Sequence, residues 1–148
     1  MHLTTKGKYA VTALLDLSLN QTSGYTSIQE IALRQDISMT YLEQLFRNLR
    51  KAGIVESLRG PKGGYRLTRL SSEINVSEVV SAVEHKMDAT QCGGTADCDS
   101  GRKCLTHDLW SELNDQVDSF LLSKSLEDVI GKKRKDFKDL RDGLIAVG

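Results

Sequence analysis

The sequence predicts a mainly α protein: a winged helix-turn-helix with a two-stranded wing, followed by a long helix suited to dimerisation. Three observations predict this class. A short helix, a turn and a second amphipathic helix follow one another between residues 27 and 52. Two strand-like runs joined by a glycine-rich turn come directly after them. A long apolar stripe at helical spacing then begins near Leu105 and ends near Leu122.

The length and the distribution of charge set the first limits on function. A chain of 148 residues is long enough for one or two small domains. The 20 basic and 20 acidic residues cancel, but residues 1–80 carry 10 and 7 of them, and residues 81–148 carry 10 and 13. A mildly basic first half is compatible with a nucleic-acid partner. No leader and no apolar run of bilayer length are present, so we expect a cytoplasmic protein with no membrane partner.

Three helices are expected in the first half. Residues 4–20 place an apolar face on one side of a helix, formed by Ala10, Ala13, Leu14 and Leu17. Ser27 and Glu30 form a capping-box pattern that opens a short second helix. Ser38 is the expected cap of a third helix that runs to about Ala52, with Gly53 just after its end. The buried stripe of this third helix is expected to be Leu42, Leu45, Phe46 and Leu49.

The wing is predicted from the segment that follows. Ile54–Leu58 and Gly64–Thr68 are strand-like, and a turn containing two glycines and Pro61 joins them. Glycines let the tip of such a hairpin lie close to a nucleic-acid backbone. Arg59 and Lys62 place cations there, which suits phosphates or a narrow minor groove.

The outward face of the third helix carries the candidate DNA readers, because the start of such a helix normally enters the major groove. Gln44 can pair with adenine and Glu43 can accept a hydrogen bond from cytosine. An exposed carboxylate among phosphates is unfavourable without such a donor, so Glu43 is expected to reject sequences as well as select them. The remaining side chains suit phosphate contacts. The predicted DNA-binding set is Ser38, Thr40, Tyr41, Glu43, Gln44, Arg47, Arg59 and Lys62, and the alternative is an ordinary solvated helix face.

A fourth helix, Val76–Val83 with Ser77 as its expected cap, leads into a loop that holds all three cysteines. The sixteen residues from Cys92 to His107 contain Cys92, Cys98 and Cys104, separated by two five-residue gaps, and His107. Cytoplasmic thiols stay reduced and the number is odd, so a disulfide framework is a poor interpretation. Four soft donors on a glycine-bearing loop indicate a metal site. Zinc sites usually have two cysteines closer together, so the spacing modestly favours a two-iron cluster and leaves zinc open.

The long helix from Leu105 to about Leu122 is expected to pair with its copy in a second subunit. Its apolar stripe is Leu109, Leu113, Val117, Phe120 and Leu121, and acidic residues line the opposite face. Such a helix beyond a small domain would otherwise expose much apolar surface, and a homodimer matches palindromic DNA half-sites. The alternative is that the helix packs back on its own domain.

These elements define four segments. Residues 1–75 form the winged helix-turn-helix, and residues 76–104 form a linking helix and the cysteine-bearing loop. Residues 105–130 form the dimerisation helix and a further short helix at Ser125–Ile130. Residues 131–148 are expected to form a flexible tail.

Four stretches together resemble the IscR family of winged-helix repressors over about residues 1–130: LTTKGKYAV, ISMTYLEQLFRNLRKAG, RGPKGGY and DATQC…C…CLTHDLW. The resemblance implies a dimer with one [2Fe-2S] cluster per subunit, held by Cys92, Cys98, Cys104 and His107. It also implies that the cluster-bound form represses cluster-assembly genes, and that the cluster-assembly machinery supplies the cluster. Lys62 stands where the family often has glycine, and the tail has no family pattern.

The sequence therefore predicts a transcription regulator whose DNA preference depends on cluster occupancy. One alternative is a zinc-stabilised or thiol-based repressor of the same fold. Another is an iron–sulfur electron-transfer or carrier protein, for which no salt-dependent DNA affinity is expected. An enzyme is not expected, because the chain has no Ser/His/Asp group apart from the ligand set and no phosphate-binding glycine loop before a helix.

Overall fold

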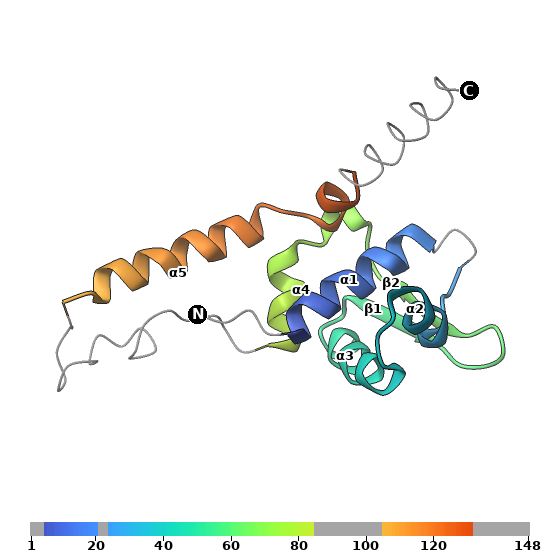
Figure 1. Ribbon diagram of the computed structural model, residues 1–148. Coiled ribbons are helices and arrows are strands. Elements are labelled where there is room, and N and C mark those ends of the chain that lie inside the picture. The colour runs from blue at the N-terminus through green and yellow to red at the C-terminus, as the bar shows by residue number, and fades with distance from the viewer. Residues whose placement is uncertain (1–4, 21–23, 85–104, 132–148) are drawn as a thin grey trace, which may run out of the picture.

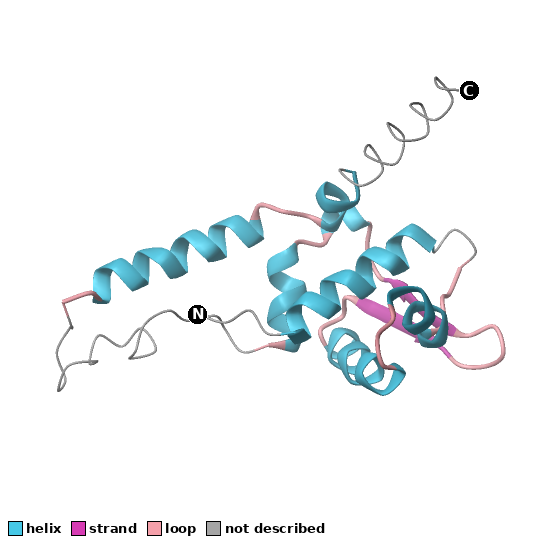
Figure 2. Cartoon of the chain, viewed as in Figure 1, coloured by secondary structure: helices cyan, strands magenta, loops and turns pink. Residues whose placement is uncertain are grey.

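The computed structural model of the chain describes residues 5–20, 24–84 and 105–131 (Figure 1). The helices are α1 (Thr5–Asn20), α2 (Ile28–Gln35), α3 (Met39–Lys51), α4 (Val76–Val83) and α5 (His107–Leu122), the strands are β1 (Val55–Leu58) and β2 (Gly64–Leu67), and a 3-10 turn, η2, spans Ser71–Glu73. Residues 126–131 are also helical. Figure 2 shows that helices dominate and that the strands form a single hairpin beside α2 and α3. The predicted mainly α winged-helix fold is confirmed.

Local capping signals set most helix starts where the sequence predicts them. Glu30 N–H donates to Ser27 Oγ at 3.2 Å, and Ser27 N–H donates to Glu30 Oε2 at 3.0 Å, which completes the expected capping box of α2. Asp36 ends that helix in a left-handed conformation, with φ of 52°. Gly53 does the same just after α3, with φ of 76°.

One expected cap and one expected helix start are corrected. Asn75, and not Ser77, caps α4: Asn75 Oδ1 accepts from Glu78 N–H at 2.9 Å, and Glu78 Oε2 accepts from Asn75 N–H at 3.4 Å. Ser77 already lies inside the first turn, so its hydroxyl is past the unpaired amides that a cap satisfies. The long helix begins at His107 and not at Leu105.

The core forms around α1, whose predicted apolar face is fully buried. α1 contacts α2, α3, α4 and β2, so each of these elements covers part of its surface. The predicted stripe of α3 meets it from below in Figure 1 and is also buried. The largest side chains with no more than 1% exposure include Phe46, Leu14, Leu17, Ile31, Leu42, Leu49, Ile54 and Ile74.

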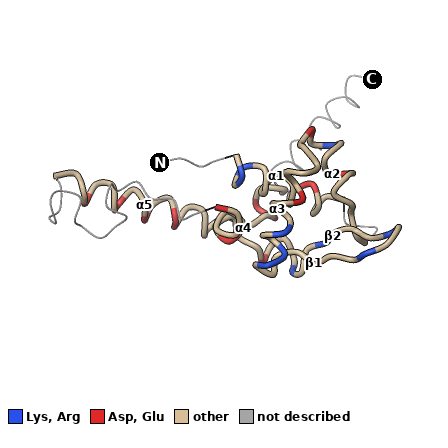
Figure 3. The backbone as a smooth tube through the Cα atoms, turned by 90° about the horizontal axis from the view of Figure 1, so that it is seen from below, with Lys and Arg blue, Asp and Glu red and all other residues tan. Residues whose placement is uncertain are grey.

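The end of the described chain returns to this body. Leu126 and Ile130 of the predicted short helix are buried, with exposed fractions of 0% and 1%. Leu126 N–H donates to Ile74 O at 2.9 Å, and Val76 N–H donates to Lys124 O at 2.8 Å. These bonds anchor the residues that follow α5 beside the start of α4, while α5 itself extends away from the body (Figures 1 and 3). Within the described ranges, no helix has the length and apolar character needed to cross a bilayer.

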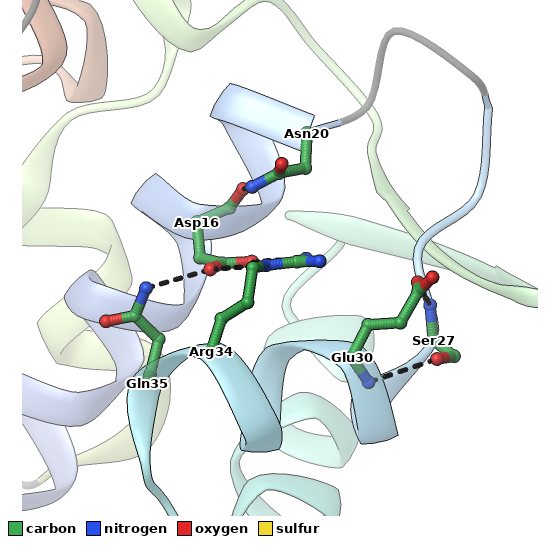
Figure 4. Close-up of polar contacts among 6 residues, drawn as sticks. All are labelled: Asp16, Asn20, Ser27, Glu30, Arg34 and Gln35. Atoms are coloured by element: carbon green, nitrogen blue, oxygen red, sulfur yellow. Dashed lines mark hydrogen bonds and ion pairs between the residues drawn. The ribbon is translucent and has the colours of Figure 1, made fainter.

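A buried carboxylate joins α1 to α2 (Figure 4). The Asp16 side chain is 2% exposed, and Arg34 Nη2 and Nε donate to its two oxygens at 2.8 and 3.0 Å. Gln35 Nε2 donates to it at 2.8 Å. Hydrogen bonding to Asp16 raises the pKa of Arg34 above its usual value, so the guanidinium stays charged. The last turn of α2 is thereby held at one position along α1.

We expect Arg34→Ala to lower the free energy of unfolding by about 2–3 kcal/mol, because it leaves the Asp16 carboxylate buried with only an amide partner. Breaking a fully buried ion pair usually costs about 3–5 kcal/mol. We expect a smaller loss here because the Arg34 side chain is 37% exposed. Urea denaturation measures it. In an Asp16→Asn background, Arg34→Ala should cost clearly less, and an equal loss in both backgrounds would show that the charge is not the cause.

Candidate nucleic-acid interface and ligand loop

α3 presents its apolar stripe to the core and its polar face to solvent. Ser38 caps the helix by accepting a hydrogen bond from the Tyr41 backbone N–H at 3.4 Å. Four of the predicted DNA-reading side chains on the helix are exposed: Thr40, Glu43, Gln44 and Arg47. The helix therefore offers base-reading and phosphate-contacting groups on one accessible surface.

Tyr41, the remaining predicted reader on α3, packs against α1. Its ring meets the Tyr9 ring edge-on, with centroids 5.6 Å apart and planes at 87°. Its hydroxyl lies 3.4 Å from Thr5 Oγ1, and the side chain is half-buried. Tyr41 thus holds the start of α3 against the start of α1, and a phosphate contact would share its hydroxyl with Thr5.

The hairpin places both predicted wing cations at its tip. β1 and β2 are antiparallel, and Glu56, opposite Arg66, forms an ion pair with it. Gly63 N–H donates to Gly60 O at 2.9 Å to close the turn, and Gly60 has φ of 117°, which favours glycine. Arg59 and Lys62 are exposed beside it. The tip can therefore approach a polyanion with both charges free of the hairpin body.

The root of the wing is bonded to the residue that precedes α2's cap, a connection that sequence reasoning missed. Thr26 N–H donates to Tyr65 O at 2.9 Å, and Tyr65 N–H donates back to Thr26 O at 2.8 Å. A Cβ on Gly64 would lie 2.3 Å from Thr26 O, so only glycine allows this approach. The Tyr65 ring packs on Phe46 of α3 at a centroid distance of 4.8 Å. These contacts fix the wing relative to α2 and α3.

Arg50 is a further exposed cation on α3 that the predicted set omits. It lies three residues after Arg47 and seven after Glu43, so all three share one helical face. That spacing is the signal that could have identified it.

The ligand loop is described only at its end. Cys92, Cys98 and Cys104 lie outside the described residues, as do His2, His85 and residues 132–148. His107, the first residue of α5, is only 6% exposed although Leu105 and Leu109 beside it are exposed. Thr106 Oγ1 accepts a hydrogen bond from Trp110 Nε1 at 3.0 Å, which braces this first turn. Within the described ranges, no group of three or more metal-binding side chains occurs.

The donor chemistry of the set nevertheless fits a metal or cluster. The His107 imidazole is buried at the start of α5, three residues after Cys104 in the sequence, so it is not a freely solvated surface group. Three thiolates and an imidazole suit either zinc or a two-iron cluster.

α5 forms an arm whose apolar stripe lacks a cover in the described chain. Leu109 and Phe120, two members of the predicted stripe, are 57% and 60% exposed. Leu113, Val117 and Leu121 are only partly buried. The expected alternative, in which the helix packs along its own domain, does not describe this arm.

Charge is segregated between the two halves of the molecule. The polar face of α5 is acidic, with Asp108, Glu112, Asp115 and Asp118, and the helix contains no lysine or arginine. Figure 3 shows this row of acidic residues, and shows basic residues on α3 and along the hairpin. A polyanion would therefore be attracted to the α3 and wing side and repelled by the arm.

Comparison with known proteins gives close relatives over nearly the whole chain. The profile of the Rrf2 family, described as iron-dependent transcriptional regulators, matches residues 3–132. A helix-turn-helix-type transcriptional regulator of Neisseria meningitidis serogroup A is 51% identical over 133 residues, which are 90% of this chain and 90% of that protein. The transcriptional regulator IscR of Xenorhabdus nematophila is 49% identical over 142 residues, which are 96% of this chain and 85% of that protein.

A solved structure gives the same fold. CymR, the global cysteine regulator of B. subtilis, superposes with a TM-score of 0.77 at 30% identity. The match covers 89% of this chain and 98% of that one. The likeness therefore extends beyond the winged helix to most of the described elements.

We expect Gly64→Ala to destabilise the protein by about 3 kcal/mol or more, because the added methyl group overlaps the Thr26 carbonyl. Gly24→Ala is the matched control, since Gly24 also has positive φ, 103°, but a Cβ there meets nothing within 4 Å. The control should cost only about 1–3 kcal/mol for its backbone conformation. Thermal and urea unfolding of both variants measure the difference, and equal losses would contradict the close approach.

Proposed function

We propose that this chain, which belongs to the Rrf2 family of iron-dependent transcriptional regulators, senses iron–sulfur cluster status through a [2Fe-2S] cluster and represses cluster-assembly genes when the cluster is bound. The chain is a DNA-binding transcription regulator of the winged-helix, IscR-like type, and not an enzyme. One observation carries the proposal. α4 packs on α1 and ends directly before the segment that bears the cysteines, and α1 in turn contacts α3.

DNA reading is assigned to α3 and the wing tip. The start of α3 enters the major groove, where Gln44 pairs with adenine and Glu43 accepts from a cytosine amino group. A site without that cytosine leaves the Glu43 carboxylate unpaired near phosphates, so it is rejected. Arg59 and Lys62 contact the backbone or the minor groove beyond. Ser38, Thr40, Tyr41 and Arg47 hold the register on phosphates.

The cluster is assigned to Cys92, Cys98, Cys104 and His107 as three thiolates and one neutral imidazole. When bound, it supplies an anionic, redox-active centre, less negative than an all-cysteine site. A neutral imidazole would hold the cluster less tightly than a fourth thiolate. Loose retention of this kind suits a sensor of cluster supply better than steady electron transfer, and the cluster-assembly machinery is the donor.

A homodimer through α5 completes the regulator. The exposure of Leu109 and Phe120 supports dimerisation, because pairing two α5 helices would remove both side chains from water. Two winged helices related by a two-fold axis match a palindromic operator on double-stranded DNA. The reduced thiols require a cytoplasmic setting.

The route between the two sites runs through α1. In the chain, the proposed ligand set lies between the end of α4 and the start of α5, so a bound cluster would act on both helices. A shift of α4 reaches α1, and the Tyr9–Tyr41 contact passes it to the start of α3. Such coupling requires loop contacts that differ between the loaded and empty forms.

A zinc-stabilised or thiol-based repressor is the second candidate. The three cysteines and one histidine of the proposed ligand set also suit a zinc shell. This candidate keeps the winged helix and its DNA contacts and replaces the cluster by zinc or by reversible cysteine oxidation. An electron-transfer or carrier function is less favoured, because it does not explain the exposed cations at the tip of the wing.

Anaerobically purified protein should be coloured and should contain about two irons and two sulfides per chain. His107→Cys should keep the colour but lower the reduction potential, because a fourth thiolate replaces a neutral imidazole. His85→Ala is the matched control and should match the wild type. Absorption spectra with iron, zinc and sulfide analysis measure the content, and a redox titration measures the potential. Colourless protein with one zinc per chain would contradict the cluster proposal and support a zinc-stabilised repressor.

Loaded and empty protein should differ in affinity for a cluster-assembly promoter by about five- to 150-fold, the range of typical allosteric coupling. Fluorescence anisotropy on anaerobic protein, with Cys92→Ala as the empty form, measures the ratio. Equal affinity on every duplex would rule out the switch but leave DNA binding intact. Affinity that does not fall with salt would favour the electron-transfer alternative.

A further inference from the structure

Three cations of α3 line a groove between this helix and the root of the wing. Arg47, Arg50 and Lys51 form one side, and Ile28 and Tyr65 form the other. Together with Glu43 they enclose about 560 Å³, and the three cations are exposed to solvent. These residues define the α3–wing groove.

The three cations of this groove have no ion-pair partner among the described residues, unlike three other arginines of the chain. Arg34, Arg66 and Arg69 each form an ion pair with a carboxylate. Within the described ranges, Arg47, Arg50 and Lys51 form no ion pair, although Glu43 lines the same groove. Three unpaired cations beside one carboxylate leave a net positive groove that favours an anion.

The end of a helix also favours cations, because they interact with its negative pole. Arg50 and Lys51 lie in the last turn of α3, so this explanation applies to them. It does not explain Arg47, which lies a full turn earlier. Nor does it explain why the three open onto a single groove whose other wall comes from α2 and β2.

The position of the groove identifies the anion. In duplex DNA one sugar-phosphate strand separates a major groove from the neighbouring minor groove. When α3 lies in the major groove and the wing tip reaches the minor groove beside it, this strand has to pass between α3 and the hairpin. Tyr65 and its bonds to Thr26 keep that passage at a fixed width.

We infer that the α3–wing groove seats the DNA strand between the two reading elements, with Arg47, Arg50 and Lys51 binding its phosphates. This inference rests on the DNA-reading part of the proposed function and not on the cluster. The contacts are to the backbone, so they raise affinity on every sequence alike and carry no base preference. They place the strand, and Glu43 at the other end of the groove then meets the bases.

The test is the salt dependence of DNA binding by the full chain. Arg47→Ala, Arg50→Ala and Lys51→Ala are each measured on a promoter duplex and on an unrelated duplex across a range of salt concentrations. Each should lower the slope of log affinity against log salt by about one per bound subunit. Each should weaken binding several-fold on both duplexes by a similar factor. Arg50→Lys, which keeps the charge, should keep the slope.

Lys124→Ala is the matched control, because Lys124 is also an exposed cation but follows α5. That segment lies across α1 from α3, so this variant should leave the slope unchanged (Figure 1). Thermal unfolding checks that every variant is folded. Unchanged slopes in the groove variants, or losses confined to one duplex, would overturn the groove assignment alone. Wild-type protein with no salt-dependent affinity for either duplex would overturn DNA reading itself and the assignment with it.

Discussion

A carboxylate buried against the apolar core is the constraint on which the helix-turn-helix depends. An ionised Asp16 that is 2% exposed is tolerable only with charged or strong hydrogen-bond donors around it. Both of its side-chain donors, Arg34 and Gln35, come from the last turn of α2. The position of α2 along α1 is therefore fixed by polar geometry, whereas apolar packing alone would tolerate sliding. α3 follows within a few residues, so its placement depends on the same contact.

The wing is joined to the rest of the winged helix by specific contacts. Thr26 links the start of α2 to the wing through two backbone hydrogen bonds, and Gly64 makes room for that link. Tyr65 of the wing packs on Phe46 of α3, and Tyr41 packs the start of α3 on α1. The positions of α3 and the wing therefore depend on each other.

The molecule uses its cations in two ways. Where an arginine has a structural role, a carboxylate accompanies it, as with Arg34 and Asp16. On α3 and the wing tip the cations stand without such partners, and α5 carries only acidic charges. An exposed cation without an internal partner breaks no ion pair when it contacts a phosphate, so these positions favour a polyanion.

The sequence by itself determined the helices of the winged helix, their apolar faces, the wing and the positions of its cations, because caps, periodicity and turn glycines act over a few residues. It also predicted that Cys92, Cys98, Cys104 and His107 form one ligand set, and of these four residues the described structure reaches only His107. Only the tertiary structure decided that Asp16 is paired across helices, that Thr26 bonds to Tyr65, that Tyr41 packs on α1, and that Arg50 joins Arg47 and Lys51 at one groove. These contacts join segments up to 39 residues apart, as with Thr26 and Tyr65. A contact between two residues so far apart in the chain leaves no repeating pattern in the sequence. It therefore becomes visible only when the chain has folded.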